Sequence, residues 1–275
     1  MPNSVVLITG CSSGFGLACA LAFAERGDHV VATMRDVARA GELQGRADIA
    51  VRELDVTRPE TIKRTIEQTL RDEGRVDVLV NNAGIAAVGA LEVVPDGLLR
   101  DVFETNVFGA LAVTRAVLPS MRRERSGRIV FMSAIGGLLN TPYLGAYCAT
   151  KHTIDCLAAT LDIELRPFGI RVSSVLPSAF HTGIAANLQA VFGEGTAYEP
   201  PTRTYHAGLT SRILGGPSDL SPVVEAVLEA ATAEDPQPRY LVAPHLADVL
   251  GPLVRTLERL HAREVSLAPG STMPS

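Results

Sequence analysis

The stretch VVLITGCSSGFG, from Val5 to Gly16, decides the fold of this chain. Its first part, Val5–Thr9, is a run of β-branched and aliphatic residues that is typical of a buried strand. The glycines that follow are spaced Gly-x-x-x-Gly-x-Gly, and a helical pattern begins among them. Such glycines let backbone N–H groups approach an anion at a helix N-terminus, where the helix dipole also favours negative charge. The stretch therefore predicts a strand, a turn and a helix that together bind a phosphate group.

Short β-branched runs alternate with longer helical patterns along the rest of the chain. This alternation predicts an α/β protein built of βαβ units, because parallel strands need a crossover connection between them. We expect a doubly wound Rossmann fold, with a parallel sheet of about seven strands flanked by helices. The predicted strands are Val5–Thr9, His29–Thr33, Ala50–Glu53, Val76–Asn81, Gly127–Ser133, Arg171–Leu176 and Arg239–Ala243. The predicted helices are Gly16–Arg26, Thr61–Glu73, Leu98–Arg122, Ala146–Arg166, Pro222–Ala233 and Leu246–Ala262.

The length of 275 residues fits one large domain better than two. The alternation ends after Pro177, and residues 181–222 are rich in glycine, proline and aromatic side chains. We expect this segment to be a substrate lid inserted into a domain of residues 1–262, with residues 263–275 as a flexible tail. The apolar, aromatic and histidine side chains of this segment have two possible roles: they line a lipophilic ligand pocket, or they pack under a long loop. They are Leu188, Val191, Phe192, Tyr198, Tyr205, His206, Leu209 and Ile213.

The composition argues against several classes of protein. A formal net charge of −5 leaves no basic excess to neutralise phosphates, so nucleic-acid binding is not the expected function. The N-terminal residues lack the basic region of a signal peptide, and no apolar run reaches the ~20 residues of a membrane span. We therefore expect a cytoplasmic protein that binds neither nucleic acid nor a membrane. The spacing of the cysteines does not follow a CxxC pattern, so we expect free buried thiols that bind no metal. These cysteines are Cys11, Cys19, Cys148 and Cys156.

Further motifs follow the glycine-rich turn in order. They are Asn-Asn-Ala-Gly at Asn81–Gly84, Tyr147-x-x-x-Lys151, and Pro177 within VLPSAFHT. Together with TGCSSGFG at Thr9–Gly16, this set resembles the short-chain dehydrogenase/reductase family over the first two thirds of the chain. The resemblance implies an oxidoreductase with one dinucleotide-binding domain. The residues of the glycine-rich turn are similar to those of the family branch that acts on hydroxysteroids, retinol and related hydrophobic alcohols.

Tyr147 and Lys151 are four residues apart on a predicted helix, so both side chains project from one face. A phenol with a pKa of about 10 is a poor base at neutral pH, but a nearby ammonium favours the phenolate and lowers that pKa. The pair therefore suits proton exchange with an alcohol or ketone oxygen. By resemblance, Lys151 also holds the nicotinamide ribose, and Asn106 in TNVFGA fixes a water for a proton relay.

The residues that end the second predicted strand indicate which dinucleotide binds. In a doubly wound fold this position meets the adenosine ribose, and an acidic side chain there repels a 2′-phosphate. The chain has Met34 at that place, followed by Arg35, whose guanidinium suits a phosphate. Asp36 is expected to point away, and Ser12 adds a hydroxyl. The sequence therefore favours NADP(H) over NAD(H). The alternative role for Arg35 is a surface charge that pairs with Asp36.

The resemblance implies a larger set of cofactor contacts. Asp55 and Val56 are expected at the adenine. Asn82 and Gly84 are expected behind the ribose, and Thr182 at the nicotinamide carboxamide. The full set of expected cofactor-binding residues is Gly10, Ser12, Ser13, Gly14, Phe15, Gly16, Arg35, Asp55, Val56, Asn82, Ala83, Gly84, Tyr147, Lys151, Pro177, Phe180 and Thr182.

The catalytic set departs from the family at one position. The family has a serine that hydrogen-bonds the substrate oxygen, and the usual register over SAIGGLLNTPYLGAY places Ala134 there. Ser133 is one residue earlier, and a one-residue shift directs a strand side chain to the other face. Three interpretations are open: an engineered serine-to-alanine exchange, a natural absence compensated by Tyr147 alone or by a displaced Ser133, and a nucleotide-binding module without chemistry. Loss of one such donor typically costs ~100–1,000-fold in rate.

These observations predict an NADP(H)-dependent oxidoreductase that interconverts a hydrophobic secondary alcohol and a ketone of steroid, polyketide or aryl type. The alternative is a catalytically weak NADP(H)-binding or regulatory protein. In the first case Tyr147 is the acid/base, Lys151 adjusts its pKa and Asn106 supports the relay. The resemblance also implies a homodimer or homotetramer, with the helices Leu98–Arg122 and Ala146–Arg166 at the subunit surface.

Overall fold

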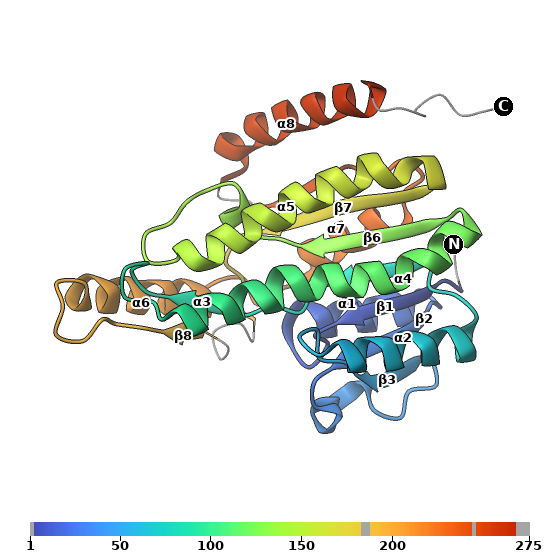
Figure 1. Cartoon of the computed structure of the whole chain (residues 1–275), viewed down its shortest axis with the longest axis horizontal. Helices are drawn as coiled ribbons and strands as arrows, with labels where there is room; N and C mark the ends of the chain where they lie inside the picture. The colour runs from blue at the N-terminus through green and yellow to red at the C-terminus, as the bar shows by residue number, and fades with distance from the viewer. Residues whose placement is uncertain (1–2, 183–187, 244–245, 268–275) are drawn as a thin grey trace.

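The computed structural model describes residues 3–182, 188–243 and 246–267. Its main feature is a sheet of seven strands in the order β3-β2-β1-β4-β6-β7-β9, in which every neighbouring pair is parallel (Figure 1). The strands are β1 (Val5–Thr9), β2 (His29–Met34), β3 (Ile49–Glu53), β4 (Val78–Asn81), β6 (Gly127–Met132), β7 (Ile170–Pro177) and β9 (Arg239–Val242). The predicted doubly wound α/β architecture is confirmed, with strand ends that differ by one or two residues.

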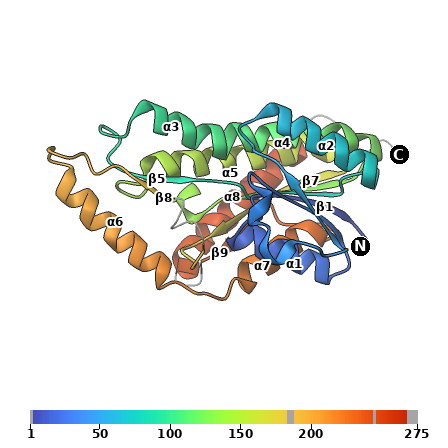
Figure 2. The same ribbon diagram turned by 90° about the horizontal axis from the view of Figure 1, so that it is seen from below.

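Helices cover both faces of this sheet (Figure 2). They are α1 (Gly14–Glu25), α2 (Pro59–Glu73), α3 (Asp96–Phe103), α4 (Ala110–Glu124), α5 (Gly145–Leu165), α6 (Glu199–Leu214), α7 (Ser221–Thr232) and α8 (Ala247–Leu267). One face carries α1 and α7, and the other carries α2, α4 and α5. The last helix, α8, lies beside α5 at the β9 edge. Short 3₁₀ turns lie at Val37–Arg39, Gly41–Leu43, Ile135–Gly137 and Arg166–Phe168.

Successive residues of β1 contribute to two separate cores. Val6 and Ile8 pack among side chains of α1 and α7, whereas Leu7 packs among those of α2, α4 and α5. Side chains alternate between the faces of a strand, so a strand covered on both sides must be apolar throughout. Full burial of each such side chain stabilises the fold by about 2 kcal/mol. Because of this requirement, the buried strands can be recognised in the sequence as continuous β-branched runs.

The predicted helix Leu98–Arg122 is continuous but irregular. A π-helical turn, Glu104–Gly109, lies between α3 and α4. Gly109 packs against Val56, and an added Cβ would come within 2.8 Å of that side chain. A π turn within a longer helix changes the direction of the side chains and is frequent at functional sites. Asn106, one of the predicted site residues, lies inside this turn.

Residues 181–222 contain regular structure that the sequence does not predict. Leu188–Ala190 forms β8, which pairs in parallel with β5 (Ala86–Val88) in a small second sheet. The helix α6 then begins with prolines in its first turn, where a missing N–H is tolerated. The glycine and proline content that suggests a loop is therefore compatible with a helix. Figure 1 shows α6 at the end of the molecule that is remote from β3 and α2.

Two smaller expectations need correction. The predicted helix Leu246–Ala262 is longer in the structure, where α8 extends to Leu267, and residues 268–275 of the expected tail lie outside the described residues. Cys11, Cys19 and Cys148 are buried free thiols as predicted, but Cys156 is exposed, because its position on α5 faces away from the sheet. Among the helices within residues 3–182, 188–243 and 246–267, none is both long and apolar enough to cross a membrane.

Candidate active site

The glycine-rich turn between β1 and α1 has no room for larger side chains. A Cβ on Gly16 would lie 2.4 Å from the carbonyl oxygen of Gly10 and 2.4 Å from Nδ2 of Asn82. The Asn82 amide donates hydrogen bonds to the carbonyls of Thr9 and Gly10, at 2.9 and 3.1 Å. Gly10 has a φ of 75°, in the region that favours glycine. Asn82 therefore holds the backbone of the turn close to the start of α1.

The start of α1 is available to an anion. No side chain caps this N-terminus, and the first turn contains no acidic residue. The first N–H groups of a helix lack partners within the helix, and the dipole there is positive. Ser12, Ser13, Gly14 and Phe15 line the adjoining cavity. These features fit the pyrophosphate of a dinucleotide.

A cavity of about 840 Å³ lies at the carboxyl ends of the strands. Because the strands are parallel, the loops that follow them meet at this edge of the sheet. The predicted residues that line the cavity are Gly10, Ser12, Ser13, Gly14, Phe15, Arg35, Asp55, Val56, Asn82, Ala83, Gly84, Ser133, Ala134, Tyr147, Lys151, Pro177, Phe180 and Thr182. Gly16 and Asn106 do not line it, but they support the turn and the loop that do.

Arg35 lines the cavity at the end of β2, directly after the buried Met34. The neighbouring Asp36 is directed toward the residues that follow, because its Oδ1 accepts a hydrogen bond from the N–H of Ala38 at 3.0 Å. Across the described part of the chain, no ion pair joins Arg35 to Asp36. The guanidinium charge of Arg35 is therefore not neutralised by the adjacent carboxylate.

Tyr147 and Lys151 lie one turn apart near the start of α5. The Nζ atom of Lys151 is 5.5 Å from the centroid of the Tyr147 ring and donates a hydrogen bond to the carbonyl of Met132 at 2.7 Å. Lys151 is only 7% exposed. The bond to β6 fixes the ammonium beside the phenol, so the two groups predicted to exchange protons are neighbours within the cavity.

Burial shifts the pKa values of both groups. It lowers the pKa of Lys151 to about 8 and raises the pKa of Tyr147 above its ordinary value. The direction for Tyr147 is opposite to the sequence-based expectation that the ammonium lowers the pKa, because burial removes hydration from the phenolate and the neighbouring Cys148 adds to the rise. At neutral pH the phenol therefore keeps its proton and the lysine keeps its charge.

Asn106 joins three segments of the site. Its Oδ1 accepts a hydrogen bond from the N–H of Ile85 at 2.8 Å, and its Nδ2 donates to the carbonyl of Ile85 at 2.9 Å. The same Nδ2 donates to the Thr150 hydroxyl at 3.0 Å, which donates in turn to the carbonyl of Tyr147 at 2.7 Å. The side chain thus connects the π turn to α5 and to the loop after β4. Its role toward a relay water stays a prediction.

The position expected to hold the family serine is apolar. Ala134 lines the cavity and is 8% exposed. The Ser133 hydroxyl donates to the carbonyl of Lys151 at 3.3 Å, and an added Cβ on Gly137 would come within 2.8 Å of it. Ser133 is therefore directed at the backbone of α5, as the alternation of a strand requires.

The wall opposite the glycine-rich turn comes from α6 and from the loop before α5. Of the lid candidates, Leu188, Tyr205, Leu209 and Ile213 line the cavity. Val191, Phe192, Tyr198 and His206 do not line it, and Phe192 instead packs edge-on against His206 at 5.4 Å between ring centroids. The lining residues that the sequence analysis missed on this side include Thr141, Leu144, Ser211 and Arg212. The spacing of Tyr205, Leu209 and Arg212 on one helical face was the available signal.

Comparisons with known proteins identify the family of this chain. Residues 4–191 match the sequence profile of the short chain dehydrogenase family. The 3-ketodihydrosphingosine reductase of Bacteroides thetaiotaomicron is 38% identical over 187 residues, which cover 68% of this chain and 68% of that protein. The estradiol 17-beta-dehydrogenase 1 of Rattus norvegicus is 36% identical over 258 residues, or 87% of this chain and 74% of that protein.

A solved structure agrees over nearly the whole length. A short-chain dehydrogenase from Streptomyces avermitilis is similar with a TM-score of 0.81 and 35% identity, over 99% of this chain and 100% of that one. The similarity of that structure covers the seven-stranded parallel sheet and the helices that flank it. The chain therefore belongs to the short chain dehydrogenase family and is an oxidoreductase.

Proposed function

We propose that this oxidoreductase uses NADP(H) to interconvert a hydrophobic secondary alcohol and the corresponding ketone. The observation that carries the proposal is the position of Tyr147 and Lys151 in the same cavity as the glycine-rich turn. A nicotinamide dinucleotide supplies hydride chemistry when it is bound. The residues of the chain bind and orient that group, and they move the proton at the substrate oxygen.

The residues for holding a dinucleotide follow the carboxyl edge of the sheet. The first turn of α1, with Ser12 and Ser13, would hold the pyrophosphate. Asp55 and Val56 would contact the adenine, and Thr182 would contact the nicotinamide carboxamide. All five residues line the one cavity, which supports a single extended site.

Arg35 supports NADP(H) over NAD(H). Its guanidinium lies at the end of β2, where a doubly wound fold places the adenosine ribose. Met34 replaces the acidic residue that would accept hydrogen bonds from a free 2′-hydroxyl. A planar guanidinium can make paired hydrogen bonds to a phosphate, and Asp36 does not compete for it. We therefore assign the 2′-phosphate to Arg35.

Tyr147 would act as the proton donor when a ketone is reduced. Burial raises the pKa of Tyr147, so the phenol keeps the proton that the ketone oxygen needs at neutral pH. Lys151, with a pKa lowered by burial to about 8, is still charged at that pH and would stabilise the phenolate left behind. A protonated Tyr147 beside a charged Lys151 is the state that proton donation to a ketone requires.

The walls of the cavity support a hydrophobic substrate. Leu144, Leu188, Tyr205, Leu209 and Ile213 line it on the side away from the glycine-rich turn. A pocket of mostly apolar side chains with a few polar groups is typical of sites for lipophilic ligands. The names of the two relatives refer to a sphingoid ketone and to a steroid alcohol, which are of this chemical type.

One observation favours a second function. Ala134 lines the cavity with a methyl group, at the position where the sequence resemblance expects a serine that polarises the substrate oxygen. An NADP(H)-binding protein with little or no turnover would tolerate this change. The intact tyrosine–lysine pair argues for the enzyme, because a binding protein has no need of a proton donor at that place.

The loss of NADPH absorbance tests the proposal directly. We would compare the unmodified chain with Ala134→Ser on a panel of steroid, polyketide-like and aryl ketones, with Tyr147→Phe as the inactive control. Ketone-dependent oxidation that Tyr147→Phe abolishes supports the enzyme. NADPH binding without oxidation of any ketone in either active form would instead favour the binding protein.

We further propose that the chain forms a homodimer or homotetramer through α4 and α5. Phe108, in the turn that leads into α4, is 55% exposed and would be buried in such an assembly. Light scattering at micromolar concentration should show more than one chain per particle. A monomer would contradict this assembly without affecting the proposed chemistry.

A further inference from the structure

One face of α6 turns three chemically different side chains toward the cavity. Tyr205, Leu209 and Arg212 are spaced by four and three residues, so they lie on the same face of the helix. All three line the cavity. This face is therefore aromatic, aliphatic and cationic in turn, and Arg212 is its one charged member.

Three cationic side chains line the described part of the cavity, and two of them already have an assigned interaction. Lys151 is bonded to a backbone carbonyl beside the reacting tyrosine. Arg35 lies at the end of β2, where the proposed function places the 2′-phosphate. The third cationic side chain is Arg212. Among the described lining residues Asp55 has the one carboxylate, and it accepts hydrogen bonds from the N–H and the hydroxyl of Thr57 at 2.9 and 2.8 Å.

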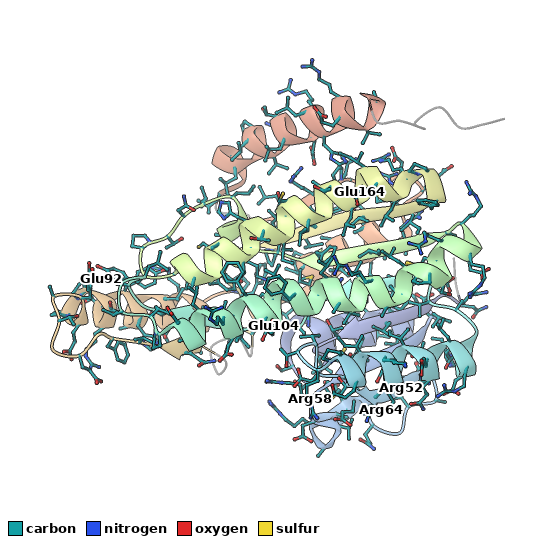
Figure 3. The ribbon with its side chains drawn as sticks, viewed as in Figure 1. Arg52, Arg58, Arg64, Glu92, Glu104 and Glu164 are labelled. Atoms are coloured by element: carbon teal, nitrogen blue, oxygen red, sulfur yellow. The ribbon has the colours of Figure 1, made fainter. Side chains whose placement is uncertain are left out.

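The carboxylates around α6 do not neutralise Arg212 either. Glu92, seen beside α6 in Figure 3, accepts a hydrogen bond from the hydroxyl of Tyr198 at 2.5 Å. Glu199 accepts a hydrogen bond from Arg203 at 3.0 Å. Within the described ranges, no carboxylate forms an ion pair with Arg212. The cavity thus has an uncompensated positive charge at its α6 wall.

Aromatic rings orient this cation. The guanidinium carbon of Arg212 lies 5.7 Å from the centroid of the Tyr205 ring, and Tyr205 lies 5.7 Å from the ring of Tyr143. Tyr143 belongs to the loop before α5 and has a φ of 60°, which is a strained conformation for a residue other than glycine. The two tyrosines thus connect α6 to the loop that leads to Tyr147.

We propose that Arg212 binds a carboxylate carried by the substrate, so that the preferred ketone has an apolar body and an acidic group remote from the carbonyl. The inference rests on the proposed function, since it assumes that this end of the cavity receives substrate. A guanidinium that stacks on an aromatic ring and has no ion-pair partner is suited to receive an anion. Leu209, between Arg212 and Tyr205, contacts the apolar part.

Calorimetric titration of the NADPH-loaded full chain with decanoate and with decanamide tests the inference. The two probes share an apolar chain, and only decanoate is charged at neutral pH. We expect decanoate to bind about fivefold more tightly, because an ion pair with an exposed guanidinium contributes up to that scale. Arg212→Gln should remove this preference, and Arg212→Lys should keep part of it.

Arg203→Gln is the matched control, because Arg203 is a second arginine of α6 that lies over Phe192 and pairs with Glu199 instead of lining the cavity. It should leave the ratio of the two dissociation constants unchanged. Equal affinities of the natural chain for the two probes, or no binding of either, would overturn the inference. So would weaker NADPH binding in Arg212→Gln, which would assign the cation to the cofactor. Absence of NADPH binding by the natural chain would instead overturn the proposed function.

Discussion

The hydroxyl of Ser133 donates a hydrogen bond to the backbone carbonyl of Lys151 at 3.3 Å. Ser133 therefore joins the end of β6 to α5. The next side chain, Ala134, lines the cavity as a methyl group. In the proposed reaction Tyr147 therefore donates the proton, and neither Ser133 nor Ala134 offers a hydroxyl to polarise the carbonyl.

Ala134→Ser should raise the rate of ketone reduction by ~100–1,000-fold, because a preorganised donor to a developing oxyanion is typically worth that much. The measurement is NADPH oxidation under substrate saturation, in the natural chain and in the variant. The matched control is Ser133→Ala in the natural chain, which should change the rate little, because Ser133 is committed to α5.

A large loss of rate in Ser133→Ala would show that Ser133 moves into the site and already replaces the missing donor. In that case Ala134→Ser should add little. The two variants therefore separate a site without a serine from a site with a displaced one.

Arg35→Ala should weaken NADPH binding several-fold or more and leave NADH binding nearly unchanged, because only NADPH carries the 2′-phosphate. Dissociation constants of both dinucleotides for both proteins give the answer. Arg39→Ala is a suitable control, since Arg39 lies in the following 3₁₀ turn and does not line the cavity. Equal losses for NADPH and NADH would show that the 2′-phosphate binds elsewhere.

The pH dependence of reduction should report on Lys151. Burial lowers its pKa to about 8, so its ammonium is present below that pH and is lost as the pH rises through it. The turnover number should fall across the same window, because a phenolate at Tyr147 is then formed without its stabilising charge. Lys151→Met should be slow at all pH values and should lack this inflection.

His152→Gln is the control for that profile, because His152 follows Lys151 on α5 and does not line the cavity. The inflection near pH 8 should persist in it. An inflection that is unchanged in Lys151→Met would assign the titration to another group and would contradict the role given to the lysine.

The fold was predictable because its signals are local. Each strand of the main sheet is covered on both faces, so runs such as Val5–Thr9 must be apolar throughout and are visible without any tertiary information. The motif residues of the site were also predictable, since the carboxyl ends of parallel strands meet at one edge. The helix α6 was missed because its prolines and glycine resemble loop signals, although prolines are tolerated in a first turn.

Features that depend on tertiary contacts could not be predicted in this way. The π turn around Asn106 includes Gly109, which packs closely on Val56, a residue far away in the sequence. The raised pKa of Tyr147 depends on how completely the fold buries the phenol, whereas the sequence showed only the neighbouring lysine. Whether Arg212 has an ion-pair partner depends on where the carboxylates around α6 lie, and the sequence does not show these positions.

A buried ion cluster behind the active-site helix gives a prediction about stability. Asp162 of α5 is fully buried, and it accepts hydrogen bonds from His261 at 2.9 Å, Arg166 at 2.7 Å, Arg171 at 3.2 Å and the N–H of Val172 at 3.0 Å. Burial by itself raises the pKa of Asp162, but the hydrogen bonds and the arginine charges outweigh it and lower the pKa to about 2. The carboxylate thus joins α5 to β7 and α8.

Asp162→Asn should lower the free energy of unfolding at neutral pH by ~3 kcal/mol, because it leaves buried cations without their anion. The folded pKa of about 2 lies below the ordinary 3.8, so the stabilisation is complete above about pH 4 and is lost as the pH falls through about 2. Urea unfolding at neutral pH and at acidic pH should therefore show a gap between the two proteins that narrows on acidification. Asp48→Asn, in an exposed pair with Arg46, is the control and should leave stability nearly unchanged at both pH values. A gap that stays constant with pH would mean that Asp162 stabilises the fold by packing and not by its charge.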